Sequence, residues 1–135
     1  MNACLDEALR LVGLGYRVLP INPVEKKPLA DLVPNGLKNA TKSETVVRTW
    51  WRARPDANLA VETSGCCVVD LDPCDGRPNE WLNTLDEPLV TNMTSTTPRG
   101  GSHLWYADPT GVLKNSASKL APNVDTRATN GYVLV

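Results

Sequence analysis

The sequence predicts an α/β (α+β) fold with a mixed or largely antiparallel sheet that carries acidic residues, preceded by a helix-bearing N-terminal lobe. Two segments in the first 53 residues have the apolar spacing of helices, and short β-prone segments separated by Gly, Pro and Asn follow them. With 135 residues, we expect one domain over 1–135, made of a lobe over about 1–56 and an acid-bearing core over about 57–135.

Both helices are predicted from apolar spacing and from capping residues. The first covers residues 3–12, whose apolar face is Leu5, Ala8, Leu9 and Val12. The second begins at the capping-box sequence Thr41-Lys-Ser-Glu44 and runs to about Arg52. Its neighbouring Trp50 and Trp51 could stack on bases or pack in the core, and aromatic residues at helical spacing favour the core.

The remaining segments are mostly expected to be strands. The predicted strands are 16–20, 58–62, 66–72, 90–96, 102–106, 124–127 and 132–135. We expect hairpins at the turn over 63–65 and at Asn130-Gly131, a short helix over 78–85, and a polar connection over 112–122.

The most informative stretch is Cys66-Cys67-Val68-Val69-Asp70-Leu71-Asp72, an apolar strand that ends in two acids. Side chains alternate along a strand, so Asp70 and Asp72 share one face at a spacing of roughly 6–7 Å. Two parallel carboxylates repel unless a cation lies between them. Because oxygen ligands suit hard cations, we expect Mg²⁺ or Mn²⁺ at this pair.

Other uses of such a pair have to be weighed. A calcium-binding loop does not fit, because Cys74 and Trp81 occupy positions that should supply ligands. A glycosyltransferase or phosphohydrolase that holds a diphosphate through a metal remains an alternative. Zinc is disfavoured because the four cysteines contain no C-x-x-C pair.

Charge and hydropathy indicate which partners and which cellular location to expect. The net charge is −1, but residues 26–54 contain seven Lys or Arg against two acids, a local balance of +5. Such a block could face phosphates or be a solvated helix face. There is no run of eighteen apolar residues and no basic-then-apolar leader, so we expect a cytoplasmic protein that does not contact a membrane.

Two later segments complete a set of groups suited to nucleotidyl transfer. His103 is the protein's single histidine and follows a Gly-Gly turn, while Asp125 begins a late strand and precedes Arg127 by two residues. Transfer with two metal ions requires carboxylates for the cations and cationic or donor groups for a triphosphate. Arg127 could alternatively pair with Asp125 and keep it ionised.

The sequence resembles the bifunctional primase/polymerase (prim-pol) catalytic domain of the archaeo-eukaryotic primase superfamily. The shared landmarks cover nearly the whole chain: Gly15-Tyr-Arg-Val-Leu-Pro20, Lys26-Lys27-Pro28, Ala40-Thr41, Trp50-Trp51, Asn58-Leu59-Ala60, Val68-Val-Asp-Leu-Asp72, Thr97-Pro-Arg-Gly-Gly-Ser-His103, Val124-Asp-Thr-Arg127 and Gly131-Tyr-Val133. The resemblance implies an RRM-like catalytic module. It also implies further strands beyond the equivalent of Val135, so we expect this domain to be truncated at its C-terminus.

The resemblance also assigns roles to individual residues. Asp70, Asp72 and Asp125 would bind the catalytic metals, and His103 would contact the phosphates of the incoming nucleotide. The other implied nucleotide contacts are Gly101, Ser102 and Arg127, with Arg99 and Lys27 as further candidates for phosphate or template.

The implied activity is primer synthesis or extension on single-stranded DNA in phage, plasmid or mobile-element replication. The implied partners are nucleoside triphosphates and a single-stranded DNA template, and a fused or associated helicase is left open. Two alternatives remain, namely a non-catalytic module that binds nucleotide or single-stranded DNA in a larger replication protein, and the D-x-D enzymes named above.

Overall fold

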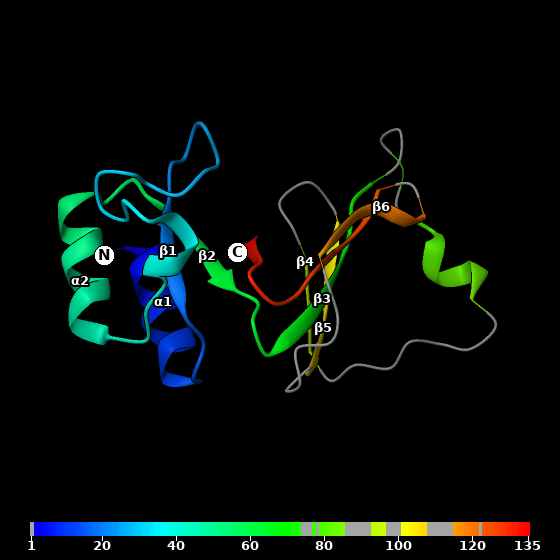
Figure 1. The fold of residues 1–135 in the computed structure, drawn as a ribbon, viewed down its shortest axis with the longest axis horizontal. Coiled ribbons are helices and arrows are strands. Elements are labelled where there is room, and N and C mark those ends of the chain that lie inside the picture. Colours follow the sequence, from blue (N-terminus) through cyan, green and yellow to red (C-terminus); the bar gives the residue numbers. More distant parts are fainter. Residues whose placement is uncertain are drawn as a thin grey trace. The chain divides into compact units, whose positions relative to one another are not determined.

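The computed structural model describes residues 2–73, 77, 79–85, 93–96, 101–107, 115–121 and 123–135. It divides into two compact units, a first unit of Met1–Glu62 with Tyr132–Val135 and a second unit of Thr63–Gly131 (Figure 1). The mixed α and β class with antiparallel sheets is confirmed. The division falls after Glu62 rather than at about residue 56, because strand β2 (Asn58–Glu62) pairs within the first unit.

The first unit contains the two predicted helices, α1 (Ala3–Gly13) and α2 (Glu44–Ala53). The predicted cap of α2 is wrong by two residues, because Ser43 and not Thr41 accepts a hydrogen bond from the Val46 amide. Thr41 is held elsewhere: its backbone exchanges two hydrogen bonds with Val18, so it continues a sheet and cannot begin a helix.

Replacing the observed cap should therefore cost more than replacing the predicted one. We expect Ser43→Ala to lower the free energy of unfolding by about 1 kcal/mol, since it removes an acceptor for an otherwise unsatisfied helix amide. Thr41→Ala should cost less than about 0.5 kcal/mol, because Thr41 accepts only an exposed hydrogen bond from the Ser43 amide. Urea denaturation measures both, and equal losses would contradict the assignment.

Three antiparallel strands form the sheet of the first unit, in the order β1 (Val18–Ile21), β2 and β8 (Tyr132–Leu134). All four residues of β1 are buried, and the short 3-10 helix η1 (Gly36–Asn39) contributes Leu37 to the packing around them. Trp50 and Trp51 are 7% and 2% exposed, which confirms that they pack in the core.

The second unit carries the acidic strand in the middle of a five-stranded sheet. The order is β4 (Met93–Thr96), β5 (Ser102–Ala107), β3 (Cys66–Leu71), β7 (Val124–Arg127) and β6 (Ser116–Ala121), and neighbouring strands are antiparallel. One face packs a core against the short 3-10 helix η2 (Trp81–Thr84), with Val69, Leu71, Leu104 and Val124 at its centre. The RRM-like detail remains a prediction.

The expected polar connection over 112–122 is wrong for its second part, which forms strand β6. Ser116 pairs with Thr126 through the backbone and also through their hydroxyl groups, at 2.7 Å. The pairing is irregular between Ser116 and Ala121, and a short polar strand of this kind has no hydrophobic alternation that would reveal it.

Neither predicted hairpin forms, because each turn carries the chain from one unit to the other. Strand β2 pairs with β1 and β8, whereas β3 pairs with β5 and β7. Both turns have their positive φ at the third residue, Gly65 (83°) in one and Asn130 (61°) in the other. Hairpins favour a positive φ at the second residue, so these turns do not favour pairing between the strands that they join.

The two crossing segments are bonded to each other within the second unit. The buried Thr63 donates from its amide to the Gly131 carbonyl and from its hydroxyl to the Ala128 carbonyl, at 2.9 and 2.6 Å. These bonds close one end of the β3–β7 pair.

Among the described residues, no helix is long and apolar enough to span a membrane.

Candidate metal centre

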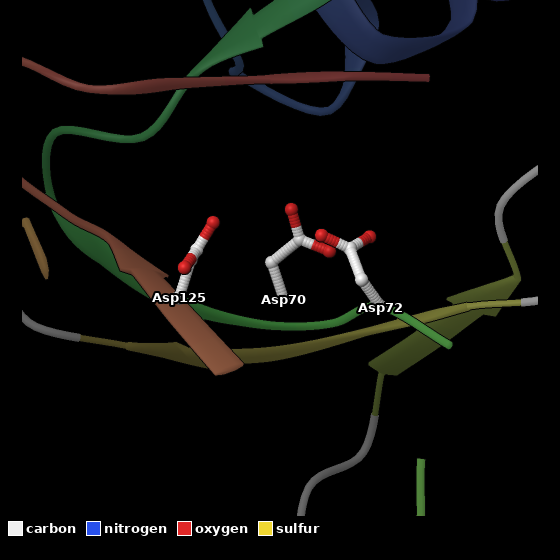
Figure 2. Close-up of side chains that lie close together, drawn as sticks. All are labelled: Asp70, Asp72 and Asp125. Carbon is white, nitrogen blue, oxygen red and sulfur yellow. The ribbon is translucent and has the colours of Figure 1, made fainter. Parts of the chain in front are cut away.

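The three predicted aspartates project from the same face of the second unit's sheet (Figure 2). Asp70 on β3 lies directly opposite Asp125 on the neighbouring β7 and directly opposite His103 on β5. Directly opposed residues of antiparallel strands point to the same face, so these three side chains form one row across the sheet. The opposite face carries Leu71 and Val69 in the core.

Asp70, Asp72 and Asp125 come close enough to share a cation. One carboxylate oxygen from each lies within 4.8 Å of the others, and all three residues are partly buried. Carboxylates at this spacing repel one another, and the repulsion is stronger where water is partly excluded. Three oxygen donors on a rigid sheet are a ligand set for a hard divalent ion such as Mg²⁺ or Mn²⁺.

One atom of Asp70 makes the fit to a cation more specific. Its Oδ1 is buried and receives no hydrogen bond. The His103 Nε2 is 3.3 Å away, but no hydrogen bond joins the two atoms. Buried carboxylate oxygens without a partner are costly, and a bound cation would remove that cost.

Arg127 follows Asp125 by two residues on β7 and therefore points to the acidic face. Its Nη2 lies 3.5 Å from Asp125 Oδ2, and Nη1 lies 3.4 Å from the carbonyl oxygens of Ser116 and Thr126. The side chain is 32% exposed. The three carboxylates and the Arg127 guanidinium together carry a charge of −2 when all four are ionised.

Of the other predicted nucleotide contacts, one lies beside the acids, one points away from them, and two cannot be related to the site. Gly101 is buried directly before β5, and extending the β3–β5 register by one residue puts it beside Asp72. Ser102 lies opposite Leu71, so its side chain points to the face away from the acids. Lys27 belongs to the first unit, and Arg99 lies outside the described residues, so their roles stay predictions.

Two asparagines that the sequence analysis did not single out contact the backbone of Asp72. Asn79 Nδ2 donates to the Asp72 carbonyl at 2.8 Å, and the Asp72 amide donates to the Asn123 carbonyl at 2.9 Å. The sequence offers one signal for Asn123, which stands just before a predicted strand. Asparagine tolerates the positive φ that turn positions often require.

An antiparallel sheet with three clustered aspartates on one face defines a class of domains able to hold a divalent metal. Comparison with protein families identifies the particular one: the model for Prim-Pol, described as bifunctional DNA primase/polymerase, N-terminal, matches residues 8–135. The chain therefore belongs to this family of DNA primase/polymerases. A comparison with curated proteins found no match.

Proposed function

We propose that this protein is a DNA primase/polymerase that transfers nucleotides to a growing strand in a metal-dependent, template-directed reaction. The proposed setting is the replication of phage, plasmid or other mobile DNA. The observation that carries the proposal is the meeting of Asp70, Asp72 and Asp125 within 4.8 Å on one sheet face of a chain that belongs to the primase/polymerase family.

In this proposal the three aspartates hold Mg²⁺ or Mn²⁺ as a two-metal site. Cations held there would supply Lewis acidity, lowering the pKa of an attacking 3′-hydroxyl and neutralising charge on the leaving pyrophosphate. The rigidity of the β3–β7 pair serves to fix Asp70 and Asp125 relative to each other. The partly buried setting reduces screening by water, which strengthens each electrostatic contact.

The incoming triphosphate would lie along the N–H donors that neighbour the acids. His103 lies on β5 opposite Asp70, and Arg127 lies on β7 two residues from Asp125; both side chains carry N–H donors that suit phosphate oxygens. Gly101 has no side chain to block close approach of its backbone beside Asp72. Ser102, Arg99 and Lys27 are further proposed contacts to phosphate or to template, and only the family resemblance supports them.

The direct test is incorporation of labelled nucleotide on primed and unprimed single-stranded DNA, with Mg²⁺ and with Mn²⁺. We expect synthesis that requires both template and metal. Salt-sensitive DNA binding without any synthesis would instead support a binding module of a larger replication protein. Turnover of a nucleotide sugar or phosphate ester without template would favour the D-x-D alternatives.

The role of His103 can be tested by calorimetric titration with a nucleoside triphosphate. We expect Mn²⁺ to tighten binding and His103→Ala to weaken it by about 10-fold, the effect of losing one hydrogen bond to a charged group. His103→Gln, which keeps a donor, should lose less. Unchanged affinity in both variants would show that His103 does not touch the triphosphate.

A further inference from the structure

We infer that Asn79 and Asn123 are positioning residues that hold Asp72 in the metal site. Asp72 differs from the other two aspartates because it lies one residue beyond the end of β3, after the last residue pair of the β3–β5 and β3–β7 ladders. Its side chain nevertheless projects from the same face as Asp70 (Figure 2). Two hydrogen-bonding contacts to the Asp72 backbone are made by asparagines beyond β3.

Asn123 provides the first contact by extending the β3–β7 ladder one residue past the pair of Leu71 with Val124. The Asp72 amide donates to the Asn123 carbonyl at 2.9 Å, and Asn123 Nδ2 donates back to the Pro73 carbonyl at 3.0 Å. Asn123 has a φ of 60°, which asparagine tolerates better than other residues with a side chain. Asn123 therefore binds the chain at the Asp72 amide and again at the carbonyl of the following residue.

Asn79 provides the second contact and joins the two strand ends. Its Nδ2 donates to the Asp72 carbonyl at 2.8 Å and to the Asn123 carbonyl at 3.3 Å, while its Oδ1 accepts from the Trp81 amide at 2.9 Å. The side chain therefore links Asp72 to η2, which packs on the core face of the same sheet. A carboxylate that ligates a metal is oriented by such contacts one step removed from the ion.

The alternative is that these bonds only stabilise the fold, and a double-mutant cycle separates the two. We expect Asn79→Ala to weaken Mn²⁺ binding by about 10-fold, as for other residues that support metal ligands. In an Asp72→Asn background the same substitution should change Mn²⁺ binding by less than about twofold, because Asn79 acts through Asp72. Asn83→Ala in η2 is the matched control and should leave Mn²⁺ binding unchanged.

A second measurement does not depend on the metal. Without metal, hydrogen exchange of the Asp72 amide should become at least about 10-fold faster in Asn79→Ala, since its bond to Asn123 is no longer braced. At position 123, Asn123→Gly accepts the positive φ but lacks the bond to Pro73, so it should also speed this exchange.

The inference rests on the proposed metal-dependent function, and the two can fail separately. If the unmodified protein bound no Mn²⁺, the proposed function would fail. If it bound Mn²⁺ and Asn79→Ala bound equally well, or the loss persisted in the Asp72→Asn background, the positioning role would be overturned. Unchanged exchange of the Asp72 amide in Asn79→Ala would overturn it on structural grounds alone.

Discussion

Asp70→Asn is expected to lower the rate of nucleotide incorporation by about 1,000-fold or more. The substitution keeps the shape of the side chain but removes the charge of the central acid in the row, the one whose Oδ1 is buried without a hydrogen bond. Several kcal/mol of charge stabilisation by bound metal correspond to a loss of this size. Primer extension under single-turnover conditions measures it.

The loss in Asp70→Asn should not come from unfolding. Removing one of three clustered negative charges relieves repulsion, so we expect the metal-free variant to unfold at the same urea concentration or a higher one. Glu80→Gln is the matched control, because Glu80 is an exposed acid of the same unit without a side-chain cap bond. Incorporation within 10-fold of the unmodified rate in Asp70→Asn would contradict the assignment.

Trp51→Ala is expected to have the largest effect on stability, a loss of about 3–5 kcal/mol in the free energy of unfolding. The ring of Trp51 is 2% exposed, and its Nε1 donates a buried hydrogen bond to the Ala57 carbonyl at 3.1 Å. Alanine would leave a cavity and an unpaired buried carbonyl. Urea denaturation followed by circular dichroism measures the loss.

Two further variants separate core packing from base stacking in this region. Trp51→Phe fills part of the cavity and should recover part of the stability, although it lacks the N–H donor. Leu14→Ala removes an apolar side chain that is 60% exposed and should change stability by less than about 0.5 kcal/mol. A Trp51→Ala variant of unchanged stability that lost affinity for single-stranded DNA would favour base stacking instead.

Local patterns in the sequence were sufficient for the helices and for the acidic strand. The apolar spacing of residues 3–12 and the alternation through Asp70 and Asp72 depend on neighbouring residues only, and the structure reproduces both. The partners of each strand depend on contacts distant in sequence. The turns after Glu62 and before Tyr132 therefore looked like hairpin turns. In the structure, strands β2 and β8 instead pair within the first unit.

In the site too, features that depend on neighbouring residues could be predicted, and contacts between distant residues could not. Spacing alone could not reveal that Asp125 lies opposite Asp70, because register across a sheet is not encoded in either strand separately. The family resemblance supplied that link. Asn79 could not be found from either source, since it lies in no periodic segment and acts through its contact with the Asp72 carbonyl.

The most direct test of the account is an anomalous difference map from crystals soaked with Mn²⁺. We predict a peak bonded to an oxygen of Asp70, Asp72 and Asp125, with the peak lost in crystals of Asp70→Asn. A fully soaked crystal with no peak at the three carboxylates, or with Mn²⁺ bound only elsewhere, would contradict the claim that this sheet face is a metal centre.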